Sequence, residues 1–228
     1  MIEKPKRIIE RTDHSSGLYQ AAFDRVIGQD DVHIILDVAA GDSPFAVEVS
    51  RHTDKRVIRV DRDYARRAPE GDDWLAEDAT DLSFEDDSVD VAISAFMMQH
   101  LTPEEQQKVL TEMLRVVRPY TDGAVGVVGL FPVYKPSKLE DTLKKAGLSD
   151  KVAMSTDYEA FERLSIAEKK LEQPTLWIPN LSGMSDADKR ALVGSIVESG
   201  AFYRRTTLAD LARRAMIART GDATVHLR

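Results

Sequence analysis

Short apolar runs alternate with segments of helical periodicity along the first part of the chain. The helical segments repeat apolar side chains at three- and four-residue spacing, as Val109, Leu110, Met113 and Leu114 do. The apolar runs are too short for helices and are typical of strands buried on both faces. They lie at residues 34–38, 56–61, 74–79, 88–94 and 124–131. Strands that alternate with helices predict an α/β fold with a doubly wound, mostly parallel sheet.

Local sequence signals mark where several helices begin and end. Thr102-Pro103-Glu104-Glu105 has the form of a capping box with proline at the first helical position, and it predicts a helix start. Comparable starts are predicted at Ser137, Thr156 and Ser185, and helix ends at Gly28, Gly147 and Gly200.

The turn after the first strand has the composition of a cofactor-binding loop. Ser43 is suited to cap the next helix, and Pro44 suits its first position. Such a strand, turn and helix aim backbone N–H groups and the positive end of the helix dipole at a ligand above the strand. A dinucleotide fingerprint requires glycine at the positions of Ala39, Gly41 and Pro44, and only Gly41 meets this requirement. The turn therefore predicts a nucleotide-type cofactor site, and a dinucleotide fits it poorly.

This turn and the motifs that follow it resemble the class I, Rossmann-like S-adenosylmethionine-dependent methyltransferases of the small-molecule type. That family carries an acid-x-Gly-x-Gly-x-Gly pattern, which here reads Asp37-x-Ala39-x-Gly41-x-Ser43 with small residues at all three glycine positions. The resemblance covers residues 33–131 well and 185–228 loosely. Its other carriers are Val60-Asp61, Glu77-Asp78-Ala79, Leu82-Ser83-Phe84, His100-Leu101 and residues 90–94 and 115–119. It implies a seven-stranded Rossmann-like sheet, S-adenosylmethionine as cofactor, and methyl transfer to an O, N or C nucleophile of a small molecule.

The resemblance also assigns residues to the cofactor. Asp61 lies about 24 residues after Asp37, near the roughly 20-residue offset at which an acid after the second strand meets a ribose hydroxyl. Asp78 and Ala79 stand where the family holds the adenine edge. Arg62 stands where a side chain covers adenine, and Asp37 is expected to help hold the cationic amino-acid end. The predicted cofactor-binding set is Asp37, Ala39, Gly41, Asp61, Arg62, Asp78, Ala79 and Ala95. A plainer interpretation of Asp61 and Asp78 is a solvated acidic surface.

His100 is the candidate catalytic residue, as a general base near the carboxyl ends of the strands. Simple packing is the alternative role for its ring. His14, Tyr19 and Trp177 are candidate substrate contacts, because flanking segments are expected to cover the site. No carboxylate set for a metal is evident, so no metal is predicted. Ser94-Ala95-Phe96-Met97 stands where nucleobase and glutamine amino-methyltransferases carry Asn-Pro-Pro-Tyr or Asp-Pro-Pro-Tyr, which argues against those classes.

Three parts are predicted along the chain. Residues 1–30 form an N-terminal helical cap, residues 31–131 and 185–228 form the cofactor-binding core, and residues 132–184 form a mainly helical insertion that covers the substrate site as a lid.

The placement of the sixth strand decides where this insertion begins. We place the strand at residues 201–206, because residues 196–202 resemble the family's passage from a helix into that strand. An alternative takes residues 138–146 as a crossover helix and residues 151–154 as the sixth strand, with the insertion later in the chain.

Composition narrows the partners. The chain has 228 residues, of which 43% are hydrophobic and 31% are charged, as in ordinary soluble proteins. Its formal net charge of −8 disfavours a nucleic acid partner. It has no cysteine, which excludes disulfides and a thiolate nucleophile. No signal peptide or membrane-spanning run is evident, so a cytoplasmic protein is expected.

The expected partner is a small-molecule methyl acceptor, and the chain is compatible with a homodimer. Two rival functions stay open at this point. One is a non-catalytic protein that binds S-adenosylmethionine. The other is an NAD-dependent oxidoreductase, against which Ala39 and Pro44 count.

Overall fold

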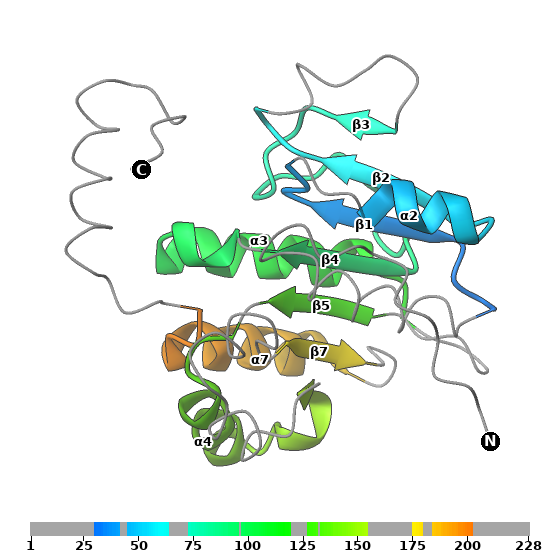
Figure 1. Cartoon of the computed structure of the whole chain (residues 1–228). Helices are drawn as coiled ribbons and strands as arrows, with labels where there is room; N and C mark the ends of the chain where they lie inside the picture. Colours follow the sequence, from blue (N-terminus) through cyan, green and yellow to red (C-terminus); the bar gives the residue numbers. More distant parts are fainter. Residues whose placement is uncertain are drawn as a thin grey trace, which may run out of the picture.

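One sheet runs through the described part of the chain in the computed structural model, with the strand order β3-β2-β1-β4-β5-β7-β6 (Figure 1). The structure describes residues 30–41, 45–63, 73–95, 97–119, 127–131, 133–154, 175–179 and 184–202. The strands are β1 (Ile34–Val38), β2 (Arg56–Val60), β3 (Trp74–Leu75), β4 (Val91–Ala95), β5 (Val127–Phe131), β6 (Ala153–Met154) and β7 (Leu176–Pro179). The helices are α2 (Phe45–His52), α3 (Pro103–Val116), α4 (Pro136–Ala146) and α7 (Asp186–Ser199), with 3-10 turns η2 (Met98–His100) and η3 (Ser149–Lys151).

The strands from β3 to β5 are parallel, as the alternation of strands and helices predicted. β1 lies between β2 and β4, with Val38 opposite Val60 on one side and Ser94 on the other. β3 extends the sheet beside β2, and β5 extends it beside β4. The carboxyl ends of these strands therefore meet at one edge of the sheet, where their arrows end in Figure 1. The predicted doubly wound, mostly parallel sheet of seven strands is confirmed.

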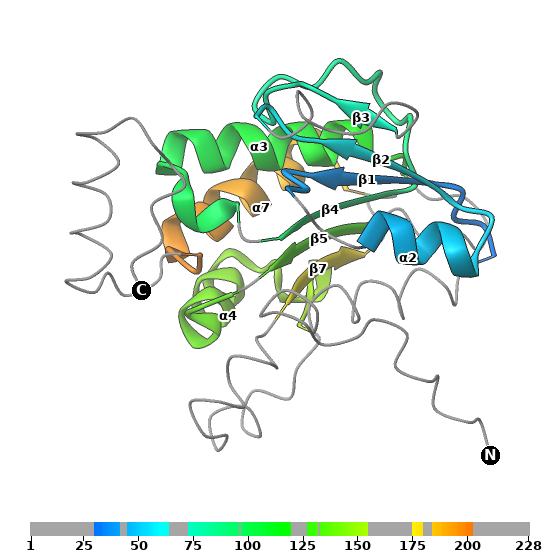
Figure 2. The same ribbon diagram turned by 45° about the horizontal axis from the view of Figure 1, so that its top comes forward.

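Helices cover both faces of the sheet. Figure 2 shows α2 on one face and α3 with α7 on the other. Leu36 and Val38 belong to the buried cluster that includes Leu110 of α3 and Ile196 of α7. Side chains alternate between the two faces of a strand, so Asp37 points to the face opposite α3 and α7.

The ends of α3 and α7 follow the predicted capping boxes. Thr102 accepts a hydrogen bond from the backbone N–H of Glu105, whose side chain accepts one from the Thr102 N–H. Ser185 and Asp188 make the same reciprocal pair at the start of α7. Gly147 ends α4 and Gly200 ends α7, each in the left-handed conformation. Among the predicted helix ends that lie in the described residues, the start of α4 differs, because α4 begins at Pro136 without a side-chain cap instead of at the box predicted from Ser137.

The sixth strand of the described residues, β6, is formed by Ala153–Met154. Of the strand preferred from sequence, residues 201 and 202 form a turn after α7, and residues 203–206 lie outside the described residues. β7 is antiparallel to both β5 and β6 and lies between them, so the structure follows the alternative placement. A two-residue strand carries no periodic pattern, which is why the sequence offered residues 151–154 only as the alternative.

This arrangement brings part of residues 132–184 into the sheet. Residues 1–29 of the predicted cap and the helix predicted from Thr156 lie outside the described residues. The covering role of the remaining insertion stays a prediction. Within the described ranges, no helix combines the length and apolar character needed to cross a membrane.

Candidate functional site

The loop after β1 adopts a tight backbone at the carboxyl edge of the sheet. Ala39 and Gly41 have φ of 58° and 54°, in the left-handed region. Glycine suits that region, whereas alanine is held there at a cost of about 1–3 kcal/mol. The backbone N–H groups of Ala39 and Ala40 both donate to the carbonyl oxygen of Val60, at 2.7 and 3.2 Å. These bonds fix the loop against the end of β2, as expected for a cofactor loop. The predicted helix cap at 43–44 lies outside the described residues.

Asp61 follows β2 and faces this loop. Its Oδ2 accepts a hydrogen bond from the Gly41 N–H at 3.2 Å, and its Oδ1 accepts one from the Asp63 N–H at 3.0 Å. The carboxylate is half-buried between the ends of β1 and β2. The structure thus brings together two of the predicted cofactor residues, Gly41 and Asp61.

Asp37 lies fully buried in β1, one residue before the strand ends. Neither of its carboxyl oxygens has a hydrogen-bond partner within the described part of the chain. Burial raises the pKa of Asp37 to about 7, with a smaller lowering by Arg59 and a further raising by Asp61. A carboxyl group with this pKa is poised to ionise when a positive charge approaches it. Its location fits the predicted role beside the cationic end of a ligand.

Arg59 is a site residue that the sequence interpretation missed. It lies opposite Asp37 across the β1–β2 ladder, and its guanidinium lies 4.5 Å from the centre of the Trp74 ring. Arg59 and Asp37 each stand one residue before the last valine of their strand. A charged residue at the same position in two neighbouring apolar strands is the signal that could have found this pair.

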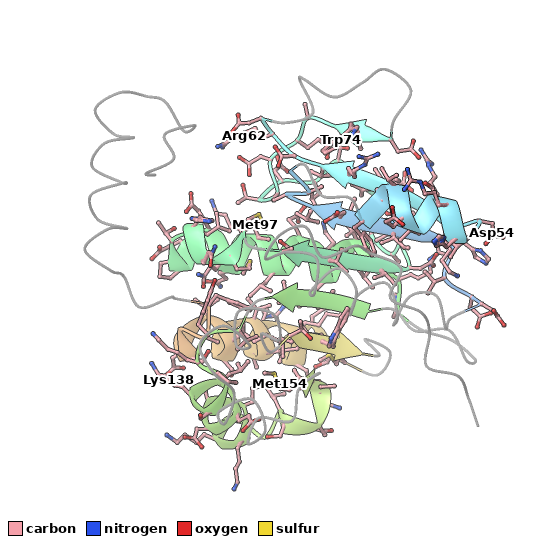
Figure 3. The ribbon with its side chains drawn as sticks, viewed as in Figure 1. Asp54, Arg62, Trp74, Met97, Lys138 and Met154 are labelled. Atoms are coloured by element: carbon pink, nitrogen blue, oxygen red, sulfur yellow. The ribbon has the colours of Figure 1, made fainter. Side chains whose placement is uncertain are left out.

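Arg62 and Asp78 come together beyond the ends of β2 and β3. Arg62 Nη1 lies 3.4 Å from Asp78 Oδ2, and Figure 3 shows Arg62 at the edge where β2 ends. Asp78 Oδ1 also accepts hydrogen bonds from the N–H and hydroxyl of Thr80. These bonds to Thr80, with a smaller contribution from Arg62, lower the pKa of Asp78, so it is ionised at neutral pH. Ala79 is half-buried against the core.

The end of β4 carries the other predicted residues. Ala95 is buried at the end of this strand, and the exposed His100 closes the turn η2 that follows. Figure 3 shows Met97 at the same edge of the sheet. Buried Gln106 of α3 donates from Nε2 to the Met98 carbonyl at 2.8 Å, which ties this turn to the helix behind it.

A polar contact extends from His100 to Gln99 and from Gln99 to Tyr134, two residues that were not predicted. Gln99 Nε2 lies 3.1 Å from His100 Nε2. The hydroxyl of Tyr134, which follows β5, donates to Gln99 Oε1. Gln99 and Tyr134 are far apart in sequence, so no local pattern links them.

The structure adds little about the three residues predicted to contact the substrate. Trp177 is buried in β7 and donates from Nε1 to Thr175 Oγ1 at 2.8 Å. Its ring covers Gly129 of β5, so packing accounts for its burial. Its substrate role stays a prediction, and His14 and Tyr19 lie outside the described residues. No group of three or more potential metal ligands is found among the described residues.

Comparison with known proteins agrees with this geometry. Residues 35–120 match a family described as a methyltransferase domain. The chain is 28% identical over 192 residues to a demethylmenaquinone methyltransferase of Clavibacter sepedonicus, covering 79% of this chain and 77% of that protein.

The fold is shared with a solved structure of low sequence identity. Phosphoethanolamine N-methyltransferase 1 of Haemonchus contortus, in complex with phosphoethanolamine and S-adenosylhomocysteine, is 13% identical with a TM-score of 0.52. The match covers 92% of this chain but only 53% of that one. A SAM-dependent methyltransferase from Archaeoglobus fulgidus is 15% identical with a TM-score of 0.48, covering 75% of this chain and 95% of that one.

Proposed function

We propose that this chain is a class I, Rossmann-like S-adenosylmethionine-dependent methyltransferase and that it methylates an O, N or C nucleophile of a small molecule. The observation that carries the proposal is the buried Asp37 carboxyl, which has no hydrogen-bond partner among the described residues and lies beside a left-handed loop. A burial of this kind is costly unless a ligand completes the site.

The residues at this edge fit S-adenosylmethionine, the cofactor of the family. Asp61 has a carboxylate suited to two ribose hydroxyls, because charge-assisted hydrogen bonds are strong and directional. Asp78 and Arg62 would meet the adenine, and the backbone of Ala39, Gly41 and Ala95 would meet the amino-acid end. Asp37 would favour the positive charge there. Bound S-adenosylmethionine supplies an already activated methyl group.

The protein's own contribution is then mainly alignment and the exclusion of water. The loop after β1 is fixed by two hydrogen bonds to Val60, so the cofactor residues need little rearrangement on binding. His100 lies at the same edge, where the acceptor molecule would enter. The acceptor is proposed to be a small molecule, covered in part by the segments that flank the core.

Calorimetry with S-adenosylmethionine and S-adenosylhomocysteine tests the cofactor half of the proposal. Asp61→Asn keeps an oxygen that can accept from the Gly41 N–H but removes the charge. We expect affinity for both ligands to fall roughly 10–100-fold, the loss of about 1.5–3 kcal/mol typical of a charged hydrogen bond. Asp63→Asn is the matched control, because Asp63 is exposed and its carboxylate lies 3.9 Å from Arg62, its one ion pair within the described residues.

Two results would contradict the proposal. One is a folded wild-type protein that binds neither ligand, or that binds NAD instead. The other is an affinity equally reduced in both variants, which would remove Asp61 from the site. If both ligands bind and no methyl transfer follows across a panel of amines, phenols and carbon acids, the protein is a non-catalytic binder.

A further inference from the structure

Tyr134, Gln99 and His100 form a hydrogen-bonded row beside the carboxyl ends of β4 and β5. Gln99 and His100 belong to η2, which follows β4, whereas Tyr134 follows β5. The two strands are parallel neighbours, so their following loops meet at one edge. The backbone N–H of Tyr134 donates to the Ala201 carbonyl at 2.8 Å, which anchors the tyrosine to the end of α7.

The row has a defined direction. The Tyr134 hydroxyl donates to Oε1 of Gln99, and this orients the amide so that Nε2 of Gln99 faces His100. An amide nitrogen can only donate hydrogen bonds. Nε2 of His100, 3.1 Å away, is therefore the acceptor. In a neutral imidazole the proton must then reside on Nδ1.

We infer that Gln99 and Tyr134 are positioning residues that hold His100 as the Nδ1–H tautomer. In this state the Nε2 lone pair faces the Gln99 amide and Nδ1 already carries a hydrogen. His100 is thus a hydrogen-bond donor at the edge of the site, and it is not set up as the general base that the sequence suggested.

The consequence for the substrate rests on the proposed function. An acceptor at this edge does not lose its proton to His100 before methyl transfer. Nucleophiles that are reactive enough without losing a proton first, such as a neutral amine or an ionised oxygen, need no such step. A neutral alcohol does need a base. The arrangement therefore favours the first group of acceptors over neutral alcohols.

Ring-nitrogen NMR spectra of the ¹⁵N-labelled protein test the tautomer directly, with the His100 signals assigned by their loss in His100→Gln. We expect the wild type to carry hydrogen on Nδ1 and not on Nε2. In Gln99→Glu the carboxylate can only accept, so Nε2 of His100 should gain a hydrogen. Gln107→Glu makes the same charge change on the exposed face of α3 and should leave the spectrum as in the wild type.

Tyr134→Phe removes the hydroxyl that orients the amide and should give signals of both tautomers. A wild-type spectrum with hydrogen on Nε2 would overturn the inference, whether or not the variants fold. So would a His100 spectrum unaffected by both Gln99→Glu and Tyr134→Phe. These spectra need neither cofactor nor acceptor, so their outcome is separate from that of the binding experiment on Asp61.

Discussion

Asp37 places an ionisable group where water does not reach it. The side chain is fully buried, and burial raises its pKa to about 7. Arg59, across the ladder, offsets only part of this cost. The free protein therefore keeps this carboxyl largely protonated below neutrality, while the same group ionises near pH 4 in the unfolded chain.

This difference predicts an unusual pH dependence of stability. The folded chain retains a proton that the unfolded chain releases between about pH 4 and pH 7, so the contribution of Asp37 to the free energy of unfolding falls as the pH rises. The side chain of the Asp37→Asn variant does not ionise, so the variant lacks this pH-dependent contribution. We expect the stability of the variant relative to the wild type to increase over that range, by at most about 4 kcal/mol.

Urea unfolding at a series of pH values measures this quantity. Other ionisable groups are common to both chains, so their contributions cancel in the difference. If the difference in the free energy of unfolding between variant and wild type stays constant from pH 4 to pH 7, the pKa of Asp37 is not raised. Added S-adenosylmethionine should stabilise the wild type more than the variant, because its positive charge favours the ionised carboxylate.

Residues with a local sequence signal could be placed in advance, and those without one could not. Asp37 and Asp61 each follow an apolar run, so their position at the sheet edge was predictable. Gln99 and Tyr134 meet only because two parallel strands end side by side. No spacing along the chain encodes that contact.

At the scale of elements, the start of α3 holds in place the turn η2, which connects β4 to this helix. α3 begins with the capping box of Thr102 and Glu105 directly after η2, which holds His100. Gln106, one turn into the helix, bonds to the Met98 carbonyl. The start of α3 therefore fixes the turn that carries the candidate active-site residues.

Removing the cap should weaken this helix. Thr102→Ala deletes the oxygen that accepts from the Glu105 N–H, and we expect the free energy of unfolding to fall by about 1 kcal/mol. Ser185→Ala should cost a similar amount at α7. Urea denaturation of both variants measures these losses.

Thr111→Ala is the matched control, since among the described residues its hydroxyl bonds only to the Gln107 carbonyl inside α3. It removes the same atoms without opening a helix end. If Thr102→Ala and Thr111→Ala lose equal stability, the cap is not what holds the start of the helix.

Elements with strong periodicity or capping signals were predictable, and weakly patterned ones were not. The strands from β1 to β5 and the starts of α3 and α7 lie close to their predicted places. β3 is shorter than predicted, with two residues, because only Trp74 and Leu75 pair with β2. β6 was misplaced because tertiary pairing with β7, and not its own sequence, makes it a strand.

At the scale of the whole molecule, one close contact joins the antiparallel β7 to the parallel part of the sheet. Trp177 lies opposite Gly129, and its buried indole covers the glycine. A Cβ atom at position 129 would lie 2.5 Å from Cζ3 of this ring. Gly129 thus makes room for the largest fully buried side chain among the described residues.

Gly129→Ala should therefore destabilise the protein, by about 1–3 kcal/mol as for other overpacked cores. Gly194→Ala is its counterpart, because a Cβ there meets nothing within 4 Å. In the middle of α7 this change should be neutral or stabilise by up to about 1 kcal/mol. Thermal unfolding of the two variants compares them, and equal effects would mean that the ring does not fill this space.

The order of the last strands has a consequence for biosynthesis. β7 lies between β5 and β6 but is translated after both of them. While the ribosome extends the chain past residue 154, β5 has no neighbour on its outer side and β6 has no strand to join. A nascent chain released before residue 176 would carry an open strand edge, which is a template for aggregation.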